Sequence, residues 1–265
     1  MESLDLSLAS EVSLSCRVFR CKTLVVLKLS CLSIFGRSSV QLPSLKTLHL
    51  VNVVLGQPKY LMKFLYGLPM LEDLKVHCLQ YTEDFDDSFF KEEFKSLPKL
   101  ISADLLSMKE CPDFPLEAIC NAESLTIREN GLDKVVCVFP NLIHVVITFV
   151  SGWNFVFEML KNCPKLQVFE LVLYGYPPGA LIYPDVVPPC LTSHLTKCSL
   201  EQYIGTEVER QFAKYIMQNS TTLRTMTISS YLRSLQLRYA MVDELTLCPR
   251  ISPLCELSFK YLSDY

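Results

Sequence analysis

The chain has 265 residues, half of them apolar and only 8 of them glycine, so its composition predicts a large buried core and excludes a disordered chain. Its 28 acidic and 25 basic residues give a net charge of −3, which gives no reason to expect nucleic acid as a partner. No stretch reaches 18 consecutive apolar residues, and the acidic start at Glu2 and Asp5 is unlike a secretory leader, so we expect neither a membrane span nor secretion.

The first residues alternate between apolar and polar side chains, which is typical of a half-buried strand. Leu6 and Leu8 precede Leu27 and Leu29 by one repeat length. The chain is therefore expected to begin inside a repeating structure. Repeat structures generally need a polar terminal cap for solubility, so we expect a further segment upstream of residue 1.

One phrase recurs along most of the chain. It has the form L-x-x-L-x-L, often preceded by proline, and its spacing of roughly 20–29 residues is the signature of leucine-rich repeats. Its first apolar slot, here called the anchor, falls at nine positions. The anchors are Leu24, Leu45, Leu71, Leu100, Ala122, Leu142, Leu166, Leu195 and Leu223.

The repeat predicts an α/β leucine-rich-repeat solenoid, with a curved parallel sheet and helices on its convex side, because each unit can bury its apolar face only against its neighbours. Many such repeats carry Asn or Cys at the ninth slot. Here that slot holds Val53 and Leu79, so we expect irregular units. The predicted organisation is irregular repeats over residues 1–175, followed by a C-terminal block over residues 176–265 that continues the solenoid.

The segments between the repeats are interpreted in chain order. Residues 58–67 (PKYLMKFLYG) predict a short helix, with proline at its start and glycine just past its end. The acidic stretch 81–87 has two interpretations, a site for a basic partner or metal and a solvated insertion before a helix at 88–95; we favour the insertion. A helix is expected at 154–161, beside Trp153, which we expect to pack in the core.

A proline-rich stretch at 176–189 marks a boundary, and a more specific pattern follows it. Thr206 and Glu209 have the spacing of a capping box that begins a helix. Apolar residues then recur at helical spacing as far as Asn219. A second helix is expected at 232–245 and a last short strand at 256–259.

This C-terminal block resembles the FBD domain, which ends many plant F-box/leucine-rich-repeat proteins. The resemblance rests on residues 187–203, 205–209 (GTEVE), 215–219 (YIMQN), 223–228 (LRTMTI) and 248–250 (CPR), and the preceding repeats are similar to the same proteins. Members usually begin with an F-box, which docks the adaptor of a cullin ubiquitin ligase. Nothing in residues 1–21 resembles one, so the adaptor is an expected partner only if an F-box lies upstream.

The 12 cysteines include no C-x-x-C pair, and several occupy apolar slots, such as Cys198. Without a secretory leader, we interpret them as reduced, buried thiols of a cytoplasmic or nuclear protein. A disulfide framework is the less favoured alternative.

The histidines give no sign of catalysis. His77 and Cys78 are adjacent, and neighbouring strand residues face opposite sides, so both could bind one metal ion only across a bulge. His49 and His144 lie several repeats apart, and no phosphate-binding loop, dinucleotide-binding motif or nucleophile elbow is present. We therefore expect no enzyme activity, no cofactor and no metal.

Protein recognition is the preferred function, because the concave sheet of a solenoid is its usual binding surface. The third and fifth slots of each repeat should point outward, with basic residues early in the chain and acidic residues later. The hypothesis is centred on His49, Lys75 and Asp104. The full set of candidate binding residues is Lys28, His49, Lys75, Asp104, Thr126, His144 and Glu170.

Three functions are ranked from these patterns. The first is the substrate-binding part of an F-box-type receptor, here without a recognisable F-box and with an unknown target protein. The second is a truncated decoy or non-functional copy with no ligase connection. The third, and least favoured, is an enzyme of unknown type.

Overall fold

The computed structural model describes residues 2–7, 17–34, 40–56, 58–81, 96–106, 116–128, 137–149, 152–174, 180–231 and 234–261. The chain forms two compact units, Met1–Asn130 (unit 1) and Gly131–Tyr265 (unit 2). Most of the acidic stretch 81–87 and all of the helix expected at 88–95 lie outside the described residues. The C-terminal block expected at 176–265 falls within unit 2.

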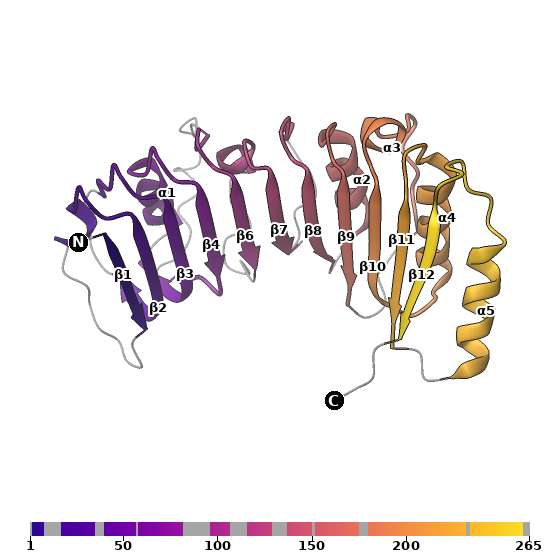
Figure 1. Ribbon diagram of the computed structural model, residues 1–265. Coiled ribbons are helices and arrows are strands. Elements are labelled where there is room, and N and C mark those ends of the chain that lie inside the picture. The colour runs from indigo at the N-terminus through magenta and orange to yellow at the C-terminus, as the bar shows by residue number, and fades with distance from the viewer. Residues whose placement is uncertain are drawn as a thin grey trace. The chain divides into compact units, whose positions relative to one another are not determined.

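Unit 1 is an α/β unit built on a parallel sheet, whose strands neighbour one another in the order β1-β2-β3-β4-β6-β7, with β5 pairing β3 (Figure 1). Its described helices are one α-helix, α1 (Pro58–Tyr66), and two short 3-10 turns, η1 (Val18–Arg20) and η2 (Leu116–Ile119). The strands are β1 (Ser3–Ser7), β2 (Val26–Ile34), β3 (Thr47–Leu55), β4 (Asp73–His77), β5 (Gln80–Tyr81), β6 (Ser102–Leu106) and β7 (Ser124–Arg128).

The repeat pattern sets the core of both units. All nine anchors are buried, and none exposes more than 3% of its surface. In β4, for example, Leu74 and Val76 are fully buried while the residues between them are half-exposed. This alternation follows from the two-residue period of a strand, so the predicted register is confirmed.

The residue at the ninth slot is buried because the residue before it, at the eighth slot, has an unusual backbone conformation. Cys31, Asn52 and Cys78 occupy equivalent eighth slots and all have left-handed backbone, with φ of 56°, 52° and 52°. Residues other than glycine rarely adopt this conformation, and asparagine does so more readily than most. The turn directs the next residue inward, and Leu32, Val53 and Leu79 are buried at 2% exposure or less. The irregular units are therefore repeats with an apolar ninth slot.

Helix α1 begins at Pro58 and ends at Tyr66, as the sequence predicts. The following residue, Gly67, donates its backbone N–H to the carbonyl oxygen of Phe64 at 3.1 Å. A Cβ atom on Gly67 would overlap the carbonyl group of Val40 in the preceding repeat. Glycine is thus needed here for close approach of two backbones rather than for its backbone freedom.

Unit 2 is also an α/β unit, with parallel strands in the order β8-β9-β10-β11-β12 (Figure 1). Its strands are β8 (His144–Phe149), β9 (Val168–Leu173), β10 (Lys197–Tyr203), β11 (Thr225–Ser230) and β12 (Glu256–Tyr261). Its helices are α2 (Trp153–Asn162), α3 (Pro189–Ser193), α4 (Glu207–Asn219) and α5 (Leu235–Thr246).

The helices expected in unit 2 are confirmed as α2, α4 and α5, and α3 was not predicted. The capping box is present: the Thr206 hydroxyl accepts from the Glu209 backbone N–H at 3.3 Å, and the Glu209 carboxylate accepts from the Thr206 backbone N–H at 2.8 Å. Phe212 of α4 packs against the ring of Trp153, with centroids 5.0 Å apart. Trp153 is 3% exposed, so it is a core residue as expected.

Two further observations concern the lengths of the helices and the state of the cysteines. Within the described ranges, no helix is long and apolar enough to cross a membrane. The cysteines of the same ranges are free thiols, and burial raises the pKa of the Cys190 thiol to about 12. A thiol with so high a pKa is a poor nucleophile, because the thiolate is the reactive form.

Candidate protein-binding face

The outward side chains of unit 1 form two rows across its sheet, together called the outward face of unit 1. In the fifth-slot row, each residue lies opposite the next on the neighbouring strand: Lys28 faces His49, His49 faces Lys75, Lys75 faces Asp104, and Asp104 faces Thr126. All five are half-exposed. The third-slot row runs in the same way through Val26, Thr47, Asp73, Ser102 and Ser124.

His49 is joined to the third-slot row by an ion-pair contact. Its Nε2 atom lies 2.7 Å from Oδ2 of Asp73, on the next strand and one outward slot away. The two side chains are 23% and 40% exposed, so the pair is partly shielded and still accessible from solution.

Asp104 contacts two basic side chains of β4. Its Oδ2 atom lies 3.3 Å from Nζ of Lys75, directly opposite, and its Oδ1 atom lies 2.8 Å from Nε2 of His77, the next outward residue on that strand. Neither Nε2 of His77 nor Oδ1 of Asp104 is reached by solvent, and their contact lacks the direction of a hydrogen bond. Asp104 therefore contacts basic side chains through both of its carboxylate oxygens.

These contacts change how the charged residues are interpreted. Exposed ion pairs add little to stability, usually between about 0 and 1 kcal/mol, so the pairs matter more for the shape of the surface than for the fold. Lys75 and Asp104, predicted as separate binding residues, neutralise each other's charge. Lys28 forms no ion pair with any described residue, although Asp5 lies opposite it in the β1–β2 register.

Unit 2 carries the remaining predicted residues. His144 begins its third-slot row and Glu170 lies in its fifth-slot row, and Nε2 of His144 is 3.1 Å from Oε1 of Glu170. The rows continue to the last strand, where Glu256 follows Thr225 and Ser258 follows Thr227. The seven predicted residues are thus divided, five in unit 1 and two in unit 2.

The arrangement supports recognition chemistry. Among the described residues, no group of three or more His, Cys, Asp or Glu side chains could hold a metal ion. The outward face of unit 1 instead carries basic residues on β2 to β4 and acidic residues on β4 and β6, at the regular spacing of parallel strands, about 4.8 Å.

Two members of this network, Asp73 and His77, are not among the binding residues predicted from the sequence. The signal that could have found them is the charge pattern on neighbouring repeats: His49 and His77 each contact an acidic residue one repeat later and one outward slot away. The pair of His144 and Glu170 follows the same rule.

Comparisons with known proteins agree with the resemblance seen in the sequence. Residues 183–228 match the FBD family model. An FBD-associated F-box protein of Arabidopsis thaliana is 28% identical over 79% of this chain and 63% of its own length. Two F-box/FBD/LRR-repeat proteins of the same plant are 28% and 29% identical, each over 92% of this chain and 67% of its own length. No solved structure gives a significant match.

The chain spans about two thirds of the length of the relatives that it matches. None of their names indicates a catalytic activity. The match at residues 183–228 covers α3, β10, α4 and most of β11 of unit 2. The predicted resemblance is therefore confirmed: residues 183–228 match the FBD family model, and the chain is similar over most of its length to plant F-box/FBD/LRR-repeat proteins.

Proposed function

We propose that this chain is the target-recognition part of an F-box-type ubiquitin-ligase receptor. In this proposal its parallel units form a leucine-rich-repeat solenoid, and the outward face of unit 1 binds the target protein in the cytoplasm or nucleus. The observation that carries the proposal is the in-register network of Asp73, His49, Lys75, Asp104 and His77 on an exposed sheet face. The similarity to F-box/FBD/LRR-repeat proteins supports the ligase connection.

The physical reason for choosing this face is pre-organisation. A recognition surface binds more tightly when its side chains are already ordered, because less conformational entropy is lost on binding. Cross-strand contacts of 2.7–3.3 Å hold His49, Lys75 and Asp104 in place without burying them. Charged groups held this way favour one partner over others by electrostatic complementarity more than they add affinity.

The test exchanges the central pair while keeping the net charge. The double variant Lys75→Asp with Asp104→Lys retains an opposite-charge pair and reverses the pattern that a partner meets. The chain and the variant are each used to capture proteins from plant cell extract, and captured proteins are compared by quantitative mass spectrometry. A target that uses this face should be depleted at least tenfold by the variant, since central contacts of an interface are worth about 2 kcal/mol or more.

A control exchange keeps the test specific. Lys161 and Glu158 form an exposed ion pair on α2 of unit 2, at 3.6 Å, away from the outward rows. The variant Lys161→Glu with Glu158→Lys should leave target recovery unchanged. Equal recovery with the Lys75/Asp104 exchange, or an equal loss with the α2 exchange, would reject the outward face of unit 1 as the binding surface. Recovery of the cullin-ligase adaptor reports separately on the ligase connection.

A further inference from the structure

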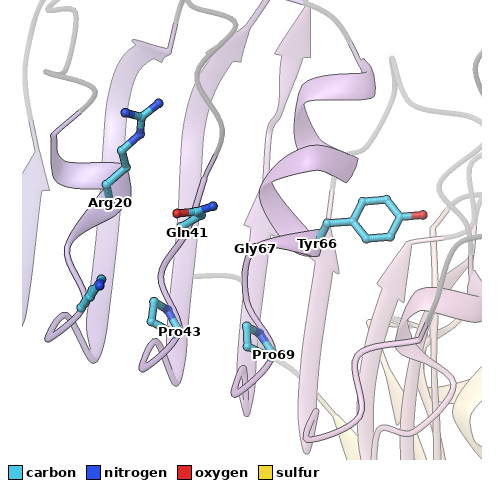
Figure 2. A pocket seen from close by; sticks show the side chains of 7 residues that line it. Arg20, Gln41, Pro43, Tyr66, Gly67 and Pro69 are labelled. Carbon is cyan, nitrogen blue, oxygen red and sulfur yellow. The ribbon is translucent and has the colours of Figure 1, made fainter.

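A pocket of about 320 Å³ lies in unit 1, among the turns that precede β2, β3 and β4 (Figure 2). Its lining includes Arg20, Pro43, Tyr66 and Pro69. Figure 2 shows the side chains of Arg20 and Tyr66 pointing away from the two prolines, so the lining does not converge on one ligand. The open edge of the sheet in unit 2 is a stronger basis for a further contact.

The sheet of unit 2 ends at β12, and no other described strand pairs with the far edge of this strand (Figure 1). β12 pairs with β11 over six consecutive residues, Glu256 to Tyr261, without a shift in register. Bulges and prolines are common devices that keep an edge strand from pairing with another chain, and β12 has neither. Its open edge is therefore a regular template for another strand.

The inward side chains of β12 are incompletely covered. Met226 and Ile228 of β11 are fully buried, whereas Leu257 and Phe259, which lie opposite them on β12, are partly exposed. β11 has a neighbouring strand on both sides, and β12 has one on a single side. A further strand at the open edge would cover these two apolar side chains, which is favourable because it removes apolar surface from water.

The backbone of β12 has free hydrogen-bonding groups at the same two residues. The backbone N–H of Glu256 donates to the carbonyl oxygen of Arg224 at 2.9 Å, so it points toward β11. Successive residues of a strand in a parallel sheet direct their backbone groups to alternate sides. The N–H and C=O groups of Leu257 and Phe259 therefore point toward the open edge.

We propose that two copies of this chain associate through β12, as an antiparallel pair of strands centred on Ser258. In this register Leu257 lies opposite Phe259 of the second copy, and the two residues exchange both of their backbone hydrogen bonds. Ser258 lies opposite its own counterpart on the twofold axis, as a symmetric interface requires. The proposal does not rest on the function assigned to the outward face of unit 1.

The charges of β12 favour this register. Glu256 and Lys260 are exposed and lie at equal distances from Ser258 along the strand, so each would face the opposite charge on the second copy. A pair centred on residue 256 or 260 would instead place like charges opposite each other, which is destabilising. By contrast β1, the first strand of unit 1, carries the single charged residue Asp5 and offers no such match.

Sedimentation velocity of the full chain over a range of concentrations measures the association. Glu256→Lys and Lys260→Glu should each weaken dimerisation at least about tenfold, because each places two like-charge pairs across the axis. The double variant Glu256→Lys with Lys260→Glu restores opposite charges in the same register and should recover the dimer. As a control, Lys197→Glu makes the same change on an exposed residue of the inner strand β10 and should leave Kd within about twofold.

Ser258→Cys tests the register itself. In an antiparallel pair, opposite residues that share no hydrogen bond have Cα atoms about 4.5 Å apart, within the range of a disulfide. Mild oxidation should therefore link this variant into a covalent dimer, above the level given by the native cysteines. Ser199→Cys, at the equivalent position of β10, should stay at that level.

Three results would each overturn the proposal. The first is a chain that stays monomeric at about 100 μM, since weak protein complexes assemble by that concentration. The second is a double variant that does not recover the dimer, and the third is equal cross-linking of the two cysteine variants. In a monomer, protection of the Leu257 and Phe259 amides from hydrogen exchange would show that another segment of the same chain covers this edge.

Discussion

The two units contain the same repeated strand, but they differ in the helices that connect one strand to the next. Among the described residues, unit 1 has one α-helix and carries its charged contacts on the outward face, at His49, Lys75 and Asp104. Unit 2 has four α-helices, and its most specific contacts lie in the helical layer, around Phe212 and Glu209. The repeat fixes the sheet in both units, and the segments between strands are where the sequence is free to differ.

This contrast separates stability from recognition. Changes in the helical layer of unit 2 should mainly reduce the free energy of unfolding, because they remove buried packing. Changes on the outward face of unit 1 should mainly alter binding, because partly exposed ion pairs contribute little to folding. The predictions below test this division, from the largest expected effect on stability to the smallest.

Phe212 should be the most costly residue to shorten. It is fully buried, and its ring packs against Trp153, Phe157 and Phe169 with centroids 5.0, 5.8 and 6.2 Å away. Phe212→Ala leaves a cavity and should lower the free energy of unfolding by about 3–5 kcal/mol. Urea unfolding followed by the fluorescence of Trp153, the single tryptophan of the chain, measures this directly.

Tyr239→Ala is the matched control, since Tyr239 is an aromatic residue of α5 that is 67% exposed. It should change stability by less than about 0.5 kcal/mol. Equal effects of the two substitutions would mean that the ring cluster is not what holds the helical layer of unit 2.

In unit 1, the corresponding destabilising substitution should be Gly67→Ala. The added methyl group would overlap the carbonyl of Val40, and a backbone group cannot move aside without breaking the stacking of the repeats. We expect a loss of about 1–3 kcal/mol, measured by urea unfolding with far-UV circular dichroism.

Gly152→Ala provides the comparison, because Gly152 has extended backbone with φ of −170° and a Cβ there would meet no atom within 4 Å. It should leave the unfolding midpoint nearly unchanged. A tolerated Gly67→Ala would show that the repeats of unit 1 can separate without cost.

Two glutamates at the start of α4, Glu209 and Glu207, should make the stability of unit 2 depend on pH in opposite directions. Burial raises the pKa of the Glu209 carboxyl, against the hydrogen bonds from its backbone donors, and its Oε1 atom is buried with no hydrogen-bond partner among the described residues. A raised folded-state pKa contributes stability at low pH, which is lost as pH rises through that pKa. Wild type should therefore lose stability relative to Glu209→Gln as pH rises from the ordinary glutamate pKa through the raised pKa of Glu209.

Glu207, two residues away, should behave in the opposite way. The hydrogen bond from Arg210 lowers the pKa of its carboxyl, so its contribution is present above the ordinary pKa and is lost as pH falls. Wild type should gain stability relative to Glu207→Gln as pH rises toward the ordinary glutamate pKa, and the difference should stay constant above it. Urea midpoints of the three proteins at several pH values test both slopes, and slopes of the same sign would contradict this account of the capping box.

Asp104→Asn should have the smallest effect on folding. It removes the charge that Lys75 and His77 share. The Lys75–Asp104 pair is partly exposed, with side chains 35% and 28% exposed, so its loss should cost no more than about 1 kcal/mol in urea unfolding. The substitution keeps the size of the side chain, so no change in packing adds to the effect of the lost charge. A loss of several kcal/mol would show that this network holds the sheet together, which would erase the contrast between the two units.

Much of the fold could be predicted because the repeat is a local pattern. The anchors, the alternation in each strand and the pairing of both outward rows follow from the spacing of apolar residues alone. The helices α1 and α4 were predictable from Pro58, Gly67 and the capping box at Thr206. The short helix α3 was missed, because a single turn beginning at Pro189 has too few residues to show a helical period.

The candidate sites were predictable to a smaller degree. Position in a row follows from register, so Lys28, His49, Lys75, Asp104 and Thr126 could be placed side by side in advance. Which of them contact one another could not, because a side chain can reach either the residue opposite or one a slot away. His49 contacts Asp73 rather than its opposite neighbour Lys75 for this reason.

The sequence by itself therefore determined the parallel strands and their buried leucine anchors, because these depend on spacing along the chain, and specific sequence segments carried the FBD resemblance. The tertiary structure alone decided the pairing of charges around Asp104, the backbone contact that requires Gly67, and the pocket between three turns. These features arise where residues 20–30 positions apart meet across neighbouring repeats. Their geometry depends on side-chain direction and backbone turns, which no one-dimensional pattern specifies.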